Sequence, residues 1–106
     1  GKILCGGHSV HPEGFEQGWY IAPTIIENLA MDARCNTEEI FGPVISITPF
    51  DSDEEVLSMA NGTEYGLAAT VWTNNLNRAH SLAANVQRGI VWVKPERMSS
   101  SLFSAT

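Results

Sequence analysis

The feature that most constrains the fold is an alternation of strand-like and helical segments between residues 44 and 93. Three runs rich in β-branched residues are typical of strands, at residues 44–50, 68–73 and 90–93. Two helical patterns separate these runs, and strands that alternate with amphipathic helices predict crossover connections. We therefore expect an α/β fold with three layers, in which a mainly parallel sheet carries helices on both faces.

The first helical pattern has its own start and stop signals. Ser52 is followed three residues later by Glu55, which is the spacing of a capping box. Acidic residues fill the rest of the first turn, where the helix dipole favours negative charge. Asn61 and Gly62 predict that the helix ends in a left-handed cap.

The second helical pattern has a one-sided apolar stripe. Asn74 or Asn75 can cap its start, and Gly89 is expected to end it. Apolar residues recur at spacings of three and four, which indicates a helix with one buried face. These residues are Leu76, Ala79, Leu82, Ala83 and Val86.

The two ends of the chain follow different patterns. Residues 2–5 and 19–29 favour extended structure, with a polar loop between them, and Pro23 suits an edge position or a strand break. Residues 94–106 are rich in serine, so we expect a divergent loop or a disordered tail there. The tryptophans lie in strand-like segments, and we expect them to be core residues. They are Trp19, Trp72 and Trp92.

Composition narrows the range of partners. The chain has 106 residues, which suits one domain, and its net charge is −6 with a pI near 4.8. An acidic chain repels phosphate, so we expect no nucleic-acid partner and no membrane partner. The uninterrupted apolar runs are far shorter than the roughly 20 residues that cross a membrane. Cys5 and Cys35 lack CxxC spacing, which is typical of reduced thiols in a cytosolic-type fold, and we expect a cytoplasmic location.

Four short motifs occur in one order along the chain. The strongest is the run EEIFGP at residues 38–43. The others are GWYIAPTI at 18–25, NGTEYGLAA at 61–69 and GIVWV at 89–93. Together they resemble the aldehyde dehydrogenase superfamily, in which similar segments occur in this order. Residues 51–55 and 68–73 resemble the corresponding segments of the branch of this superfamily that acts on muconic-type semialdehydes.

The resemblance covers residues 1–93 and implies a partial catalytic domain of an NAD(P)-dependent aldehyde dehydrogenase. Such enzymes oxidise an aldehyde to a carboxylic acid through a thiohemiacetal on a cysteine, and a glutamate activates the hydrolytic water. The family carries both groups upstream of these motifs, and neither Cys5 nor Cys35 lies in the nucleophile motif. No catalytic residue is therefore assigned, and the isolated chain is expected to be inactive. The resemblance also implies NAD as cofactor, with NADP as the alternative, a small aldehyde as substrate and a homo-oligomeric parent.

Two residues of the 38–43 run match family positions at the cofactor. Glu39 matches the glutamate that binds the nicotinamide-side ribose, and Phe41 matches the aromatic residue beside the nicotinamide ring. An ionised carboxylate has two acceptor oxygens, which suit the two hydroxyl donors of a ribose. In an extended backbone, residues two apart point to the same face. We therefore expect Glu39 and Phe41 to meet adjacent parts of one dinucleotide.

Other interpretations compete with this assignment. Glu38 is expected on the surface, and a phenylalanine beside a strand is usually part of a core. His8 and His11 have an H-x-x-H spacing, but a glycine-rich loop gives no rigid face for ligands, so no metal site is expected. Lys94 stands where the family has an asparagine. The alternative to an enzyme segment is a non-catalytic α/β binding or interaction module.

Overall fold

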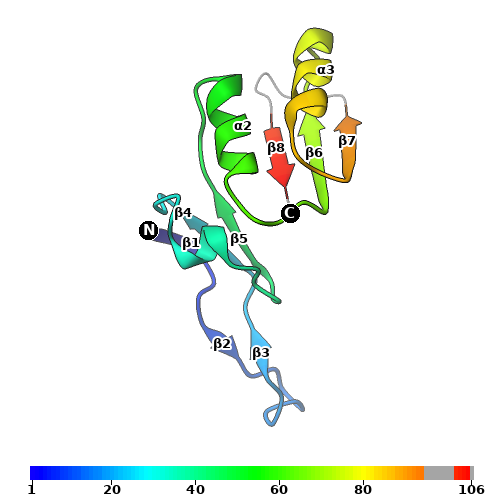
Figure 1. The fold of residues 1–106 in the computed structure, drawn as a ribbon. Helices are drawn as coiled ribbons and strands as arrows, with labels where there is room; N and C mark the ends of the chain where they lie inside the picture. Colours follow the sequence, from blue (N-terminus) through cyan, green and yellow to red (C-terminus); the bar gives the residue numbers. More distant parts are fainter. Residues whose placement is uncertain (95–101, 106) are drawn as a thin grey trace. The chain divides into compact units, whose positions relative to one another are not determined.

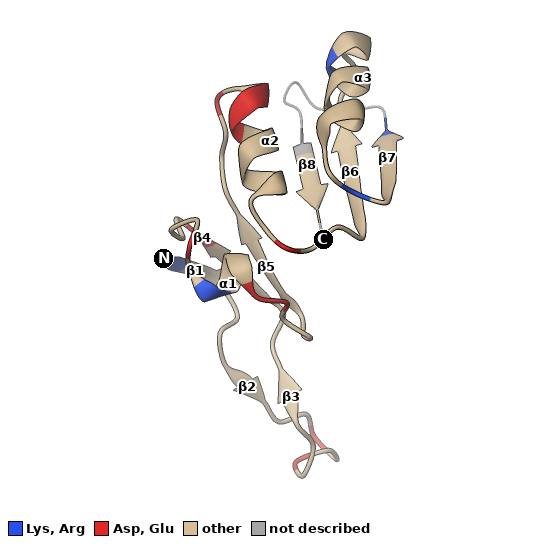
Figure 2. Ribbon diagram, viewed as in Figure 1, with Lys and Arg blue, Asp and Glu red and all other residues tan. Residues whose placement is uncertain are grey.

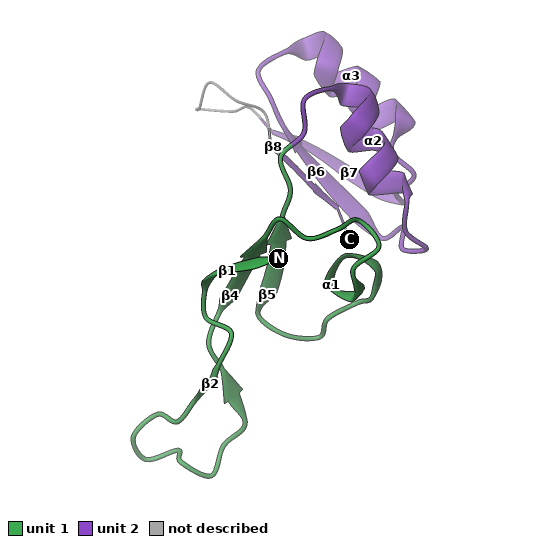
Figure 3. Ribbon diagram, turned by 90° about the vertical axis from the view of Figure 1, so that its left-hand side faces the viewer, with its two compact units in different colours: residues 1–49 green, residues 50–106 purple. Residues whose placement is uncertain are grey.

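The computed structural model describes residues 1–94 and 102–105. The chain forms two compact units, Gly1–Pro49 and Phe50–Thr106, which are coloured separately in Figure 3. Among the residues described, no helix has the length and apolar content needed to span a membrane.

The first unit contains one three-stranded sheet and one two-stranded ribbon (Figure 1). In the sheet, β4 is central and pairs antiparallel with β1 and parallel with β5. β2 and β3 form the antiparallel ribbon. The elements are β1 (Lys2–Cys5), β2 (Ser9–Val10), β3 (Tyr20–Ile21), β4 (Thr24–Glu27), the short helix α1 (Arg34–Thr37) and β5 (Val44–Ile47).

Thr24, at the start of β4, forms hydrogen bonds with three other residues of the first unit. Its hydroxyl oxygen accepts a hydrogen bond from the Gly7 amide (2.9 Å) and donates one to the Ala22 carbonyl (2.8 Å). Its own amide donates to the carbonyl of Pro43, 2.8 Å away, just before β5. Thr24 is the one buried residue among residues 1–49. The apolar side chains of this unit are therefore exposed or only partly buried.

The second unit is an α/β arrangement around a sheet with the strand order β7-β6-β8. β6 pairs parallel with β7 through the crossover helix α3, and antiparallel with β8. Both helices lie on the same face of this sheet (Figure 3). The elements are α2 (Asp53–Asn61), β6 (Ala68–Trp72), α3 (Leu76–Asn85), β7 (Ile90–Lys94) and β8 (Leu102–Ala105).

The core of the second unit lies between the two helices and the sheet. Val56, Val71 and Leu82 form one buried cluster, with Phe50, Leu57, Val91 and Phe103 packed against it. A second cluster consists of Ala60, Ala69 and Val86. The apolar stripe predicted for α3 is confirmed at Ala79 and Leu82, which are its buried residues.

The helix starts follow the sequence signals, and the helix ends follow them only in part. The Ser52 hydroxyl accepts the Glu55 amide (3.1 Å), and the Asn75 side chain caps α3 by accepting the Arg78 amide (3.0 Å). α2 ends at Asn61, as predicted, but the predicted left-handed cap is wrong, because Gly62 has φ −79°. Likewise, α3 ends at Asn85, four residues before Gly89. Side-chain caps depend on residues within one turn of the helix start, which the sequence shows directly.

Replacing Ser52 with alanine is expected to lower the free energy of unfolding by about 1 kcal/mol, because the Glu55 amide loses its partner. Urea unfolding followed by circular dichroism measures this change. Ser58→Ala is the matched control, since Ser58 is exposed in the interior of the same helix. Equal midpoints for the two variants would show that the cap contributes nothing.

The predicted α/β class and the β6–α3–β7 crossover are confirmed, but the strands are distributed differently from the expected single sheet. β5 pairs with β4 in the first unit and not with β6 or β7. Each three-stranded sheet combines one parallel and one antiparallel pairing, and α2 and α3 share one face. An apolar pattern identifies a strand without identifying its neighbour, so this arrangement was not readable from residues 44–93.

The prediction of a loop or disordered tail over residues 94–106 is wrong for Lys94 and for residues 102–105. Lys94 is the last residue of β7, and residues 102–105 form β8. Phe103 and Ala105 pack against the core of the second unit, which gives this serine-rich stretch enough apolar burial to form a strand. Residues 95–101 and 106 lie outside the described part of the chain.

The prediction of core tryptophans is also wrong. Trp19 is fully exposed and Trp92 is 58% exposed. In β6 and β7, Val71 and Val91 face the helices, so strand alternation turns Trp72 and Trp92 to the opposite face. Among the described residues, no helix covers that face.

Candidate cofactor-contact segment

The segment that carries Glu39 and Phe41 connects α1 to β5 and is held by backbone hydrogen bonds. The Gly42 amide donates to the Ile40 carbonyl, and the Val44 amide donates to the Gly42 carbonyl, each at 2.9 Å. Such bonds between residues two apart form tight three-residue turns. The Pro43 carbonyl is fixed to the Thr24 amide in β4. The loop is therefore anchored to the sheet at its C-terminal end.

The side chains of this segment lie at the surface. Phe41 is 93% exposed and Glu39 is also exposed. The competing interpretation of Phe41 as a core residue therefore does not hold within the described structure. A nearly bare aromatic ring next to an accessible carboxylate presents an apolar face and two hydrogen-bond acceptors on one short loop. This combination suits a ligand with a planar ring and neighbouring hydroxyl groups.

Glu38 forms an ion pair with Arg34. Its two carboxylate oxygens accept hydrogen bonds from Nε (2.8 Å) and an Nη (3.0 Å) of Arg34, one turn back in α1. The Arg34 guanidinium lowers the pKa of Glu38, and the same pair raises the pKa of Arg34. Glu38 is exposed, as predicted. The pair stabilises the turn at the end of α1.

The two cysteines occupy different elements of the first unit. Cys5 is exposed in β1, with its Sγ 3.8 Å from the Pro23 carbonyl, and Cys35 is half-buried in α1. Both are free thiols.

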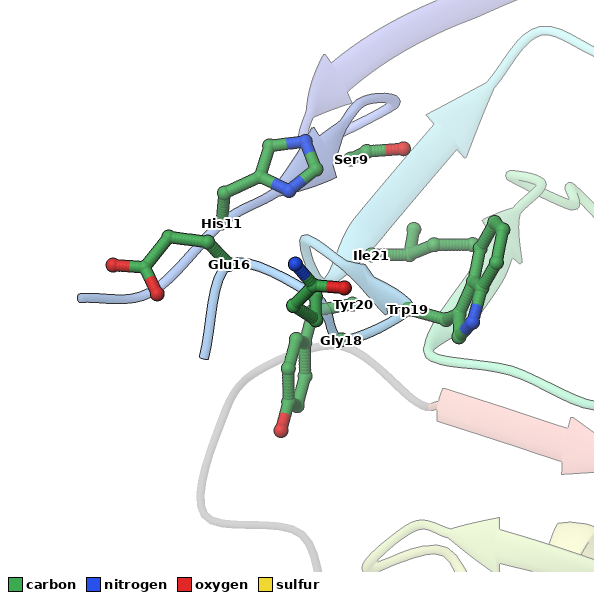
Figure 4. A pocket seen from close by; sticks show the side chains of 8 residues that line it. Ser9, His11, Glu16, Gly18, Trp19, Tyr20 and Ile21 are labelled. Atoms are coloured by element: carbon green, nitrogen blue, oxygen red, sulfur yellow. The ribbon is translucent and has the colours of Figure 1, made fainter. Parts of the chain in front are cut away.

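The β2–β3 ribbon and the loop that connects its two strands, which includes His11, line a shallow pocket of about 340 Å³. Figure 4 shows the His11 ring above the pocket, with the Glu16 carboxylate and the Trp19 ring on opposite sides of it. The Glu16 carboxylate accepts the Gly14 amide (2.9 Å), and backbone hydrogen bonds lower its pKa. Among the described residues, no group of three histidine, cysteine or acidic side chains could hold a metal ion.

Comparison with known proteins places the chain in a family. A model of the aldehyde dehydrogenase family matches residues 1–102. The chain belongs to the aldehyde dehydrogenase family. This match reaches β8, beyond the boundary at residue 93 that the motifs suggested, and that boundary stays a prediction.

Individual aldehyde dehydrogenases resemble the chain over most of its length. It is 53% identical over 95 residues to a 2-aminomuconic 6-semialdehyde dehydrogenase from a Pseudomonas species, covering 88% of this chain and 19% of that protein. It is 48% identical over 81 residues to the 2-aminomuconic semialdehyde dehydrogenase of Homo sapiens, covering 76% of this chain and 17% of that one. It is 45% identical over 95 residues to 4-trimethylaminobutyraldehyde dehydrogenase A of Danio rerio, covering 88% and 19%.

Solved structures give the same result at the level of the fold. The crystal structure of PnpE from Pseudomonas sp. WBC-3 matches with a TM-score of 0.82 and 39% identity, covering 93% of this chain and 20% of that one. An indole-3-acetaldehyde dehydrogenase complexed with NAD+ matches with a TM-score of 0.81 and 40% identity over the same shares. The chain thus spans about a fifth of the length of the aldehyde dehydrogenases that it matches.

Proposed function

We propose that this chain is a segment of the catalytic domain of an NAD-dependent aldehyde dehydrogenase, which oxidises an aldehyde to a carboxylic acid. Family membership and the NAD+ complex of a relative with 40% identity support this proposal. The nucleophilic cysteine and the general base would come from parts of the enzyme outside residues 1–106. NADP is the alternative cofactor.

We propose that Glu39 and Phe41 position the nicotinamide end of this dinucleotide. The observation that carries the assignment is the exposure of both side chains on a loop that backbone hydrogen bonds fix to β4. The Glu39 carboxylate would accept hydrogen bonds from the ribose hydroxyls, and the Phe41 ring would pack near the nicotinamide. The bound dinucleotide supplies the hydride acceptor of the reaction. Since a reacting pair must approach within about 3–3.5 Å, restricting the ring position favours the transfer.

The substrate that we propose is a semialdehyde. Relatives from three mammals and a Pseudomonas species carry the name 2-aminomuconic semialdehyde dehydrogenase or 2-aminomuconic 6-semialdehyde dehydrogenase, at 45–53% identity. We further propose that the parent enzyme is a homo-oligomer of the cytoplasm without a nucleic-acid or membrane partner. A non-catalytic α/β module is the alternative function.

The proposal is tested by assaying the full-length enzyme and the 106-residue chain in parallel. With an aldehyde and NAD, the full-length enzyme is expected to form NADH, measured by absorbance, and the 106-residue chain is expected to form none. Turnover by the short chain would contradict the placement of the nucleophile outside it. A folded full-length protein that never reduces NAD or NADP would favour the non-catalytic module.

A further inference from the structure

The hydroxyl of Thr24 lies at a break between two antiparallel pairings of the first unit. The β1–β4 pairing ends on one side of this break, and the β2–β3 ribbon begins on the other. Pro23 lies within the break and has no amide to donate. The Thr24 hydroxyl bridges it, because it accepts the Gly7 amide (2.9 Å) and donates to the Ala22 carbonyl (2.8 Å).

The backbone of the neighbouring turn fits closely around this hydroxyl. Gly6 has φ +76° and Gly7 has φ +79°, a left-handed conformation that favours glycine. A Cβ atom at Gly6 would collide with the Pro23 carbonyl and the Thr24 hydroxyl. Thr24 is 5% exposed, and all of these neighbours belong to the first unit. The burial of Thr24 therefore does not depend on other parts of the parent enzyme.

The same residue holds the loop that carries Glu39 and Phe41. The Thr24 amide donates to the Pro43 carbonyl at 2.8 Å, and the β4–β5 register begins with Thr24 opposite Val44. Phe41 lies two residues before Pro43, and Figure 2 shows the acidic stretch of this loop, in red, between α1 and β5. Since the hydroxyl fixes the orientation of the Thr24 backbone, it also fixes the point at which this loop is anchored.

We propose that Thr24 is a positioning residue of the cofactor site, which acts through its hydrogen bonds and does not touch the dinucleotide. This inference rests on the proposed contacts of Glu39 and Phe41. A loop that is already ordered loses less conformational entropy when the dinucleotide binds. Without the Thr24 hydroxyl, only a fraction of the molecules holds the loop in the binding orientation. The apparent affinity for NAD falls by that fraction, and saturating NAD restores the orientation.

Steady-state kinetics of the full-length enzyme test this role. Thr24→Val replaces the hydroxyl with a methyl group and is expected to raise KM for NAD about fivefold, since the hydrogen bonds of the hydroxyl are lost. Both kcat and KM for the aldehyde are expected to stay within about twofold of the original values. Thr24→Ser keeps the hydroxyl and is expected to keep KM for NAD close to its original value. A general loss of folded enzyme would instead lower kcat and leave both KM values unchanged.

A second background tests whether Thr24 acts through Glu39. Glu39→Gln weakens the contact that the loop makes, so adding Thr24→Val is expected to raise KM for NAD by no more than about twofold further. The role of Thr24 would be overturned by an unchanged KM for NAD in Thr24→Val, by an equal rise in both backgrounds, or by a Thr24→Ser enzyme as impaired as Thr24→Val.

The two proposals fail in different ways. If Glu39→Gln lowers kcat/KM for NAD and Thr24→Val changes nothing, only the role of Thr24 is wrong. If Glu39→Gln itself has no effect, the cofactor contact of the loop is wrong.

A second variant covers the case in which Thr24→Val does not fold, which circular dichroism would show. Thr24→Ala removes the same hydroxyl without placing a carbon atom against the Ala22 carbonyl. The same rise in KM for NAD is expected. A folded Thr24→Ala enzyme with the original KM for NAD would contradict the proposal.

Discussion

Leu82→Ala is expected to lower the free energy of unfolding of the chain by about 3 kcal/mol. Leu82 is 1% exposed in α3 and packs with Val56 from α2 and Val71 from β6. Truncation leaves a cavity at the point where both helices meet the sheet, and the surrounding elements can collapse only partly into it. Urea unfolding measures the change as a shift of the midpoint.

The matched control for Leu82 lies on the same helix. Leu76 is 70% exposed at the start of α3, so Leu76→Ala is expected to change the free energy of unfolding by less than about 0.5 kcal/mol. Both variants replace a leucine of α3 with alanine. A difference between their losses of unfolding free energy therefore reports the difference in burial of the two side chains. Similar losses for both variants would mean that α3 does not pack on the sheet as described.

Glu39→Gln in the full-length enzyme is expected to lower kcat/KM for NAD by about tenfold to a hundredfold. The substitution keeps the size of the side chain but removes its charge and one of its acceptor oxygens. Hydrogen bonds to a charged group contribute about 1.5–3 kcal/mol, and each 1.4 kcal/mol corresponds to a factor of ten. Steady-state kinetics with NAD as the varied substrate measures the effect.

Glu38→Gln is the control for Glu39, because it makes the same change one residue away. Glu38 is held by Arg34 and is exposed, and surface ion pairs contribute little. We expect its kcat/KM for NAD to stay within about twofold of the original value. If both variants lost activity equally, the effect would come from the net charge of this loop and not from a contact of Glu39.

The sequence predicted the parts of the fold that depend on local chemistry. The caps at Ser52 and Asn75, the apolar stripe of α3 and the parallel pairing of β6 with β7 are all present. Each follows from interactions within a few residues or from one crossover unit. The pairing of β5 with β4 and of β8 with β6 depends on long-range contacts, which local patterns do not specify.

Motif resemblance predicts the candidate site at the loop before β5, whereas the topology of the sheet favours the opposite end of the parallel strands. Ligands of parallel α/β sheets usually bind beyond the carboxyl ends of the strands. The loop with Glu39 and Phe41 instead precedes β5, at the amino end of the parallel β4–β5 pair. Exposure of Phe41 is the structural signal that supports the assignment, and composition alone could not predict it. Whether Glu39 and Phe41 face one ligand stays a prediction.

A crystal structure of the full-length enzyme with bound NAD tests the central claim most directly. The account predicts that the Glu39 carboxylate lies within about 3 Å of the hydroxyls of the nicotinamide-side ribose, with the Phe41 ring in contact with the nicotinamide. A dinucleotide whose ribose hydroxyls lie beyond about 4 Å from Glu39, with Phe41 turned away from the ring, would contradict it.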